Sequence, residues 1–220
     1  MTYDLIATLL RPFARWGRLR VDGLAAVPEE GPLLVVTNHD SQWDPVLIGL
    51  ALHPRRRLRF LARASLWRIP GLGLLLNALR QIPIRRDAGD EAALEHAVAA
   101  LRSGEAVCVF PEGRLSWGEH LRARSGVARL AQACPGVRIV LCAVEGTTDY
   151  VRFPRRPRVR ISFFRPENGD PRPDVPPAEV ATRLLDQIRA RVPPIPAGRR
   201  ARVGGPPRAR RASARRASRS

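Results

Sequence analysis

Apolar runs of strand length alternate with segments of helical periodicity from residue 31 onward. The runs typical of buried strands span residues 33–38, 57–63, 81–86, 105–110, 137–144 and 158–164. The helical patterns span residues 44–53, 65–79, 89–104, 125–134 and 177–192. Strands that alternate with helices predict an α/β fold, a single domain with a largely parallel mixed sheet flanked by helices.

The first segment, residues 3–20, predicts an amphipathic helix that Pro12 kinks or interrupts. At about 100° per residue, its apolar and basic side chains fall on different sides. The apolar side holds Leu5, Leu9, Phe13 and Trp16, and the basic side holds Arg11, Arg15 and Arg18. Such a helix can lie in a membrane interface, or it can pack on its own domain with a solvated arginine face. Both interpretations stay open at this point.

The last segment is rich in proline, arginine, serine and alanine and has no apolar periodicity. This composition cannot form a core, so it predicts a disordered basic tail. We therefore divide the chain into an N-terminal amphipathic helical segment (1–30), a folded domain (31–192) and a disordered tail (193–220).

The chain is strongly basic, with 38 arginines and no lysine against 20 acidic residues, a formal net charge of +18. Residues 198–220 hold nine of the arginines and no acid, so residues 1–197 still carry a net +9. This excess favours an anionic partner: an acidic membrane surface, a phosphorylated metabolite, a coenzyme or a nucleic acid. No nucleic-acid-binding motif accompanies the charge, and we favour the membrane surface.

The apolar runs and the cysteines also bear on location. No run approaches the ~20 apolar residues that a membrane span needs. The three cysteines, Cys108, Cys134 and Cys142, have no metal-ligand spacing, and two of them lie inside apolar runs. They are interpreted as buried reduced thiols, which suit a reducing cytosol. We expect a peripheral protein on the cytoplasmic side of the cell membrane.

Polar residues that could take part in catalysis or binding lie between two apolar segments in "TNHDSQWDP", residues 37–45. His39 follows a predicted strand, and Asp40 or Ser41 is expected to cap the helix after it. Asp44 would then lie in the first turn of that helix, where the helix dipole favours a carboxylate. In this geometry Asp44 fixes the tautomer of His39 and leaves the other ring nitrogen as a base.

Two further strands end in polar residues. Glu112 and Gly113 follow the strand in "CVFPEGRLS", and "QIPIRRD" ends in Arg85 and Arg86, a pair suited to phosphate. The carboxyl ends of strands in α/β sheets are where ligands collect. Three strand ends thus offer a base with its orienting carboxylate, an acid–glycine turn and paired arginines.

The sequence resembles the 1-acylglycerol-3-phosphate acyltransferase (lysophospholipid acyltransferase) family from about Gly31 to Gly146. The ordered pair of "NH" with Ser41 and Asp44, followed by "FPEG", carries the resemblance. The other matched positions are Ile82, Ile84, Arg86, Arg124 and Gly126.

The resemblance implies acyl transfer from acyl-CoA or acyl-carrier protein to the free hydroxyl of lysophosphatidic acid. It implies His39 as the catalytic base and Asp44 as its orienting carboxylate. Arg86, Glu112, Gly113 and Arg124 are implied to bind the lysophospholipid acceptor. No cofactor and no metal is implied beyond the acyl donor.

The sequence also departs from the family pattern. Arg80 stands where a glycine usually opens the second motif, and Arg114 and Leu115 replace the threonine and arginine after Glu-Gly. Arg138 and Leu141 replace the prolines of the fourth motif. These changes allow another acceptor: glycerol 3-phosphate, an amino-acid-derived lipid or a glycolipid. Alternatives of other classes are a basic nucleic-acid-binding protein and a metal phosphohydrolase built on the pair His39 and Asp40.

Overall fold

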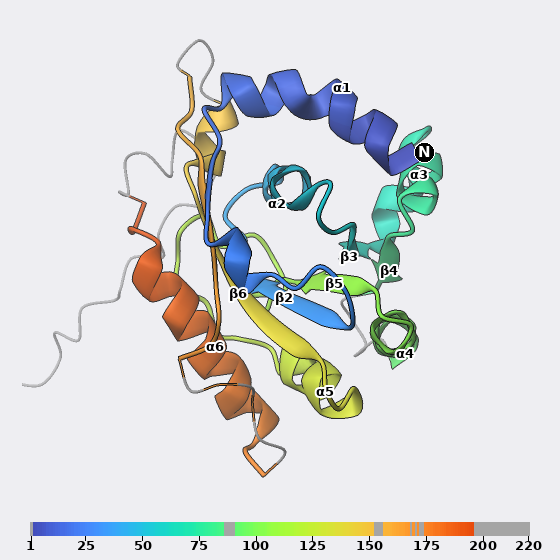
Figure 1. The fold of residues 1–220 in the computed structure, drawn as a ribbon, viewed down its shortest axis with the longest axis vertical. Helices are drawn as coiled ribbons and strands as arrows, with labels where there is room; N and C mark the ends of the chain where they lie inside the picture. The colour runs from blue at the N-terminus through green and yellow to red at the C-terminus, as the bar shows by residue number, and fades with distance from the viewer. Residues whose placement is uncertain are drawn as a thin grey trace, which may run out of the picture.

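The computed structural model describes residues 2–85, 91–151, 156–167, 169, 171 and 174–195. In these residues seven strands form one sheet in the order β1-β7-β6-β2-β5-β3-β4, parallel throughout except for the β6–β7 pair (Figure 1). The strands are β1 (Arg20–Asp22), β2 (Leu33–Thr37), β3 (Leu58–Arg63), β4 (Ile82–Ile84), β5 (Ala106–Val109), β6 (Arg138–Glu145) and β7 (Arg160–Phe164). The predicted α/β fold with a largely parallel mixed sheet is confirmed.

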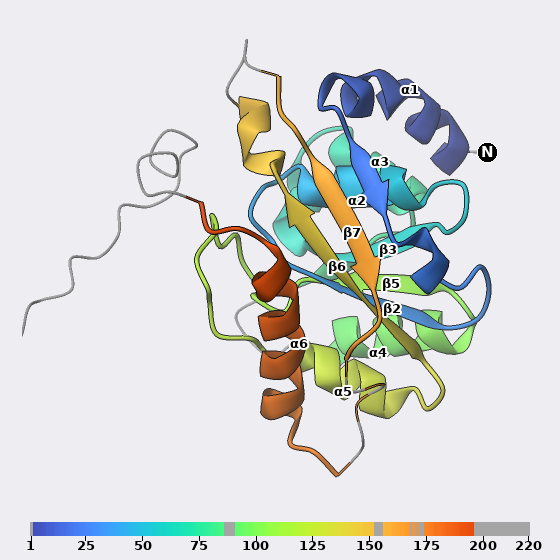
Figure 2. The same cartoon turned by 60° about the vertical axis from the view of Figure 1, so that its left-hand side comes forward.

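Helices cover both faces of this sheet. The helices are α1 (Thr2–Trp16), α2 (Asp44–Leu52), α3 (Leu72–Ala78), α4 (Glu91–Arg102), α5 (Gly126–Ala133) and α6 (Pro177–Arg191), with 3-10 turns η1 (Leu24–Ala26), η2 (Ala64–Arg68) and η3 (Thr147–Val151). Figures 1 and 2 show α1 and α2 on one face and α4, α5 and α6 on the other. All five residues of β2 are buried, because both faces of this central strand are covered.

The core accordingly consists of two layers, one on each side of the sheet. Leu33 and Val35 of β2 pack with α2 and with the aromatic side chains of α1. Leu34 and Val36 point the other way, into the layer formed with α4, α5 and α6. The alternation of side chains along a strand explains this division. The carboxyl end of β2 lies at the edge of the sheet where its strand ends, and His39 follows there.

The N-terminal helix α1 is continuous through Pro12, so the predicted interruption is absent, and a kink at Pro12 stays a prediction. Its predicted apolar side is divided, because Phe13 packs against Trp43 and Tyr150 whereas Leu5 and Leu9 are 61% and 68% exposed. Strand β1, which follows α1, was not predicted, since its three residues are too few to show a pattern.

Three other predictions meet the structure as follows. Cys108, Cys134 and Cys142 are all buried free thiols, as predicted. Of the predicted tail, residues 196–220 lie outside the described residues. No helix in the described part of the chain combines the length and the apolar character needed to cross a bilayer.

Candidate active site

His39 and Asp44 meet at the carboxyl end of β2. His39 lies two residues beyond β2, and Asp44 is the first residue of α2. The distance from His39 Nδ1 to Asp44 Oδ2 is 3.1 Å. Asp44 is fully buried, whereas the His39 side chain keeps 12% of its surface exposed. The predicted pairing of a loop histidine with a first-turn carboxylate is therefore present.

The partners of Asp44 determine which nitrogen of His39 carries a proton. Asp44 Oδ2 also accepts the N–H groups of Asp40 and Ser41, each at 2.8 Å, and Oδ1 accepts the Thr147 hydroxyl at 2.5 Å. A carboxylate held by donors on every side is an acceptor only, so Nδ1 of His39 donates to it. The Nε2 lone pair is then available as a base, and no described residue forms a hydrogen bond with Nε2.

The prediction that Asp40 or Ser41 caps α2 is wrong. The residue before the helix is Trp43, and no side chain caps it. The Asp40 carboxylate turns away from α2 and accepts hydrogen bonds from Asn38 Nδ2 at 2.8 Å and from Arg189. The ring of His39 and the carboxylate of Asp40 thus have different partners, and the described residues contain no group of three or more potential metal ligands.

Glu112 and Gly113 occupy the turn after β5, next to the His39 loop. Glu112 Oε2 accepts the main-chain N–H of His39 at 2.7 Å, and burial raises the pKa of Glu112 while the charge of Arg189 opposes that rise. Gly113 has a φ of +67°, and a Cβ there would lie 2.5 Å from Nε of Arg124. The left-handed φ favours glycine here, and a side chain would also require Arg124 to move. The structure thus brings Glu112, Gly113 and Arg124 together.

The second motif is described only in part. Arg86 lies outside the described residues, so its predicted contact with a phosphate stays a prediction. Arg80, which stands at the usual glycine position, has a φ of +55°. This left-handed conformation costs a residue with a Cβ about 1–2 kcal/mol, and it explains why glycine suits the position. Arg80 is held by an ion pair with Glu105 at 2.9 Å.

His39 lines an apolar cavity that borders a second, basic cavity. The apolar cavity, about 690 Å³, lies between α1, α2, α3 and β3. The basic cavity, about 710 Å³, is lined by arginines including Arg85, Arg122 and Arg124. Phe110 and Arg114 line both cavities, and the Phe110 ring stacks on His39 at 4.0 Å between centroids. His39 therefore lines the apolar cavity and lies against Phe110, which also lines the basic cavity.

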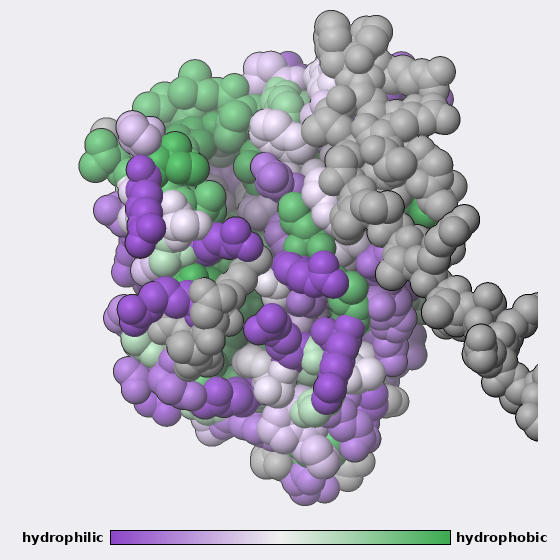
Figure 3. All heavy atoms as spheres, turned by 180° about the vertical axis from the view of Figure 1, so that it is seen from behind, coloured by the Kyte–Doolittle hydropathy of each residue, from purple (hydrophilic) through white to green (hydrophobic). Residues whose placement is uncertain are grey.

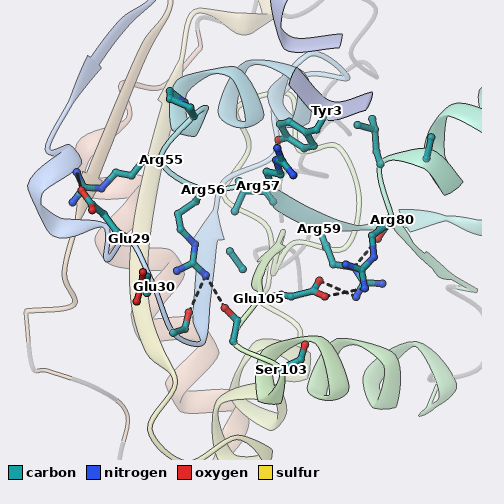
Figure 4. Close-up of a pocket in the computed structure, with 17 residues that line it drawn as sticks. Tyr3, Glu29, Glu30, Arg55, Arg56, Arg57, Arg59, Arg80, Ser103 and Glu105 are labelled. Carbon is teal, nitrogen blue, oxygen red and sulfur yellow. Dashed lines mark hydrogen bonds and ion pairs between the residues drawn. The ribbon is translucent and has the colours of Figure 1, made fainter. Parts of the chain in front are cut away.

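A third cavity, about 810 Å³, lies at the opposite edge of the sheet and is lined by several arginines (Figure 4). Most of its arginines have partners within the protein, although the buried Nη1 of Arg56 has no hydrogen-bond partner among the described residues. Arg55 pairs with Glu29 at 3.1 Å, and Arg59 pairs with Glu105 at the same distance. Arg56 donates to the carbonyls of Gly31 and Gly104 and so ties the start of β2 to the end of α4. We interpret this cavity as structural.

Four residues of the site were assigned no role from the sequence. Thr147 binds Asp44, and Asn38 links Asp40 to the main chain of Val144 at 2.8 Å. Ser116 N–H donates to the His39 carbonyl at 2.7 Å, and Arg189 of α6 binds Asp40 and Glu112. Asn38 lies within the "NH" motif and Ser116 ends the stretch "CVFPEGRLS", whereas no pattern in the sequence marks Thr147 or Arg189.

His53 and His120 lie outside this site, in structural or surface positions. His53 Nε2 binds Asp4 Oδ1 at 3.1 Å and connects α2 with α1. His120 Nε2 binds Asp186 Oδ1 at 2.9 Å, with more than half of both side chains exposed.

Known proteins are similar to this chain in sequence and in fold. Residues 18–145 match the family model described as "Acyltransferase". An uncharacterized protein of Mycobacterium leprae is 28% identical over 159 residues, which cover 64% of this chain and 41% of that protein. A lyso-ornithine lipid O-acyltransferase of Pseudomonas aeruginosa is 31% identical over 156 residues, covering 66% of this chain and 58% of that protein.

The crystal structure of a 1-acyl-sn-glycerophosphate acyltransferase from Thermotoga maritima superposes with a TM-score of 0.65 at 24% identity, covering 86% of this chain and 80% of that one. This likeness concerns the fold. The chain spans about two fifths to three fifths of the length of the Mycobacterium and Pseudomonas relatives. The family match extends over more than half of the chain and includes both the His39 and the Glu112 motifs. The resemblance predicted from the motifs is confirmed, and this chain belongs to the acyltransferase family.

Proposed function

We propose that this protein transfers a fatty acyl group from acyl-CoA or acyl-carrier protein to the free hydroxyl of lysophosphatidic acid, giving phosphatidic acid. The observation that carries the proposal is the position of His39, which lines the apolar cavity and stacks on Phe110, a residue that lines both cavities. The apolar cavity suits an acyl chain, since ligand cavities of about 300–1,000 Å³ bury most of a bound molecule. The arginines of the basic cavity suit a phosphate.

The proposed reaction is direct transfer between the two substrates. His39 Nε2 takes the proton of the acceptor hydroxyl, and the oxygen attacks the thioester carbonyl carbon to form the new C–O bond. The C–S bond then breaks, and the proton on His39 passes to the leaving thiolate. Asp44, at 3.1 Å from the ring, stabilises the imidazolium that forms between these two steps.

The site also favours direct transfer over a covalent acyl-enzyme. The hydroxyl of Ser116 is buried and bonded to Asp40 and to the His39 carbonyl, so its donor is engaged away from the ring. Burial raises the pKa of the Cys108 thiol well above its ordinary value, which suppresses the reactive thiolate. The base is therefore left to activate the acceptor itself, and we propose no cofactor beyond the acyl donor.

A second acceptor class has independent support. Leu115 stands where the family usually has an arginine, and it lines the apolar cavity. The Pseudomonas relative is named for a lyso-ornithine lipid, an amino-acid-derived acceptor. An acceptor of this class would use the same hydroxyl chemistry with a different headgroup.

A panel of donors and acceptors with purified protein tests the proposal. We expect transfer from acyl-CoA or acyl-carrier protein to lysophosphatidic acid, with weaker transfer to glycerol 3-phosphate and to a lyso-ornithine lipid. Product formation followed by mass spectrometry, in detergent and in vesicles, measures each combination. Preferred transfer to the lyso-ornithine lipid would replace the acceptor and keep the chemistry. Failure with every acceptor would contradict the proposed function.

We further propose that one corner of the molecule binds an anionic membrane surface on the cytoplasmic side of the cell membrane. Figure 3 shows apolar side chains gathered at one corner of the surface. All the exposed large hydrophobic residues among those described lie on α1 or on the η2–α3 segment, namely Leu5, Leu9, Ile69, Leu74 and Leu75. They are accompanied by exposed arginines: Arg11 and Arg15 of α1, Arg63 before η2 and Arg68 at its end. A cluster of exposed apolar side chains with flanking arginines suits anionic lipid.

Substituting both Leu9→Glu and Leu74→Glu is expected to lower binding to vesicles containing anionic lipid by about 10²-fold, since each buried leucine contributes about 1.5–3 kcal/mol. Vesicle co-sedimentation at several salt concentrations measures this. The control variant carries Ala92→Glu and Ala99→Glu on exposed positions of α4, the same change of charge on the other face of the sheet. Equal binding by the two variants would contradict the assigned surface.

A further inference from the structure

Arg189 lies in the last turn of α6, yet its guanidinium reaches the loops around His39. Nε donates to Glu112 Oε1 at 2.9 Å, and Nη1 and Nη2 donate to the two carboxylate oxygens of Asp40 at 3.0 and 2.9 Å. Nη2 also contacts Glu112 Oε1 and, at 2.6 Å, the hydroxyl oxygen of Ser116. Only 10% of the Arg189 side chain is exposed. The guanidinium therefore connects helix α6 with the loop after β2 and the loop after β5.

These partners of Arg189 hold the main chain of His39 on both sides. Glu112 Oε2 accepts the His39 N–H at 2.7 Å. Ser116 donates its N–H to the His39 carbonyl oxygen at 2.7 Å, and its hydroxyl oxygen lies 3.1 Å from the same carbonyl oxygen. Asp40, the next residue in the chain, accepts the Ser116 hydroxyl. The backbone that carries the base is thus fixed by groups that converge on Arg189.

The ionisation of the two carboxylates in this cluster, Asp40 and Glu112, depends on the charge of Arg189. Asp40 and Glu112 are each only 3% exposed. Burial raises the pKa of Asp40, but the hydrogen bonds and charge of Arg189 outweigh burial and hold that pKa below its usual range. The pKa of Glu112 stays raised, because burial and the neighbouring Asp40 oppose the charge of Arg189. Without Arg189, two buried carboxylates would repel each other across the loops that position His39.

We propose that Arg189 is a positioning residue for acyl transfer, which holds the His39 and Glu112 loops in the geometry that presents the His39 ring to both cavities. This inference rests on the proposed function. The family usually has a threonine and an arginine after Glu-Gly. Leu115 stands at the position of that arginine here, and it lines the apolar cavity. Among the described residues, Arg189 is the arginine that binds Glu112, and it comes from α6 instead of the motif.

The test compares Arg189→Met with Arg183→Met, a change of the same kind on the same helix at a partly exposed ion pair with Glu179. We expect Arg189→Met to lower kcat about 10²-fold with little change in the KM of either substrate, because a displacement of about 1 Å at a base has an effect of that size. Arg183→Met should retain wild-type kinetics. Wild-type kcat in folded Arg189→Met would overturn the proposal.

A second pair of measurements separates positioning from folding alone. Adding Asp40→Asn removes one of the two repelling carboxylates, so the double variant should regain about tenfold in kcat over Arg189→Met. This double variant also serves if Arg189→Met does not fold. No regain in a folded double variant would overturn the electrostatic basis of the proposal.

The pH dependence has a definite sign. In Arg189→Met the carboxylate pair has a raised pKa in the folded state. The contribution of this pair to the stability of the folded variant is therefore greatest at low pH and is lost as pH rises through that pKa. The difference in Tm from wild type should therefore shrink from about pH 8 to about pH 5. A difference that grows as pH falls would overturn the proposal.

The ring of His39 gives a reading independent of acyl transfer. NMR of labelled histidine, with His39 assigned from His39→Gln, should show shifted or broadened His39 ring signals in Arg189→Met and unchanged signals in Arg183→Met. Identical His39 signals in both variants would overturn the proposal. Wild-type protein that transfers to no acceptor would contradict the proposed function, and Arg189 would still be judged from these signals.

Discussion

His39→Ala is expected to lower kcat for acyl transfer about 10³-fold, the middle of the range for loss of a general base. The acceptor hydroxyl would have to lose its proton to water, because His39 is the only histidine and no carboxylate is present among the described residues that line the apolar cavity. The variant should remain folded, since Asp44 keeps three of its four donors, the N–H groups of Asp40 and Ser41 and the hydroxyl of Thr147. Steady-state kinetics with thermal unfolding measure both effects.

The control for this variant is His120→Ala. His120 also pairs with a carboxylate, Asp186, but this pair is exposed at the surface. It should keep wild-type activity. A folded His39→Ala protein with wild-type kcat would remove His39 from the catalytic role and leave the proposed mechanism without a base.

Asp44→Asn is expected to lower kcat by about 10³-fold through loss of charge, with less loss of structure than removal of the side chain would cause. An asparagine can keep its carbonyl toward His39, Asp40 and Ser41 and its amide toward Thr147, whose hydroxyl can accept as well as donate. The shape of the site is thereby retained. The imidazolium formed during proton transfer, however, no longer has a carboxylate 3.1 Å away. Kinetics on the folded fraction separate this effect from stability.

Asp186→Asn is the matched control for Asp44→Asn, because it makes the same substitution in an exposed histidine–carboxylate pair. It should leave kcat unchanged. If Asp44→Asn matched this control, the role of Asp44 in stabilising the imidazolium would be rejected, and its contacts with the loop would be structural only.

The fold was predictable because its signals are local. The strands β2, β5 and β6 are apolar runs bounded by turns, and the helices between them have clear periodicity. The meeting of His39 with Asp44 also followed from one strand-to-helix boundary. Strand β1 was not predicted, because its three residues form a strand by pairing with β7, which lies far away in the sequence.

The sequence by itself determined the family, the α/β fold and the pairing of His39 with Asp44, since these depend on residues close together in the chain or at ordered strand ends. Only the tertiary structure decided the role of Asp40. Its position suggested a helix cap, whereas its carboxylate binds Arg189, 149 residues away. The tertiary structure also brought Thr147 to Asp44. Such contacts depend on how distant elements pack, because a buried carboxylate takes whichever donor or cation the fold places beside it.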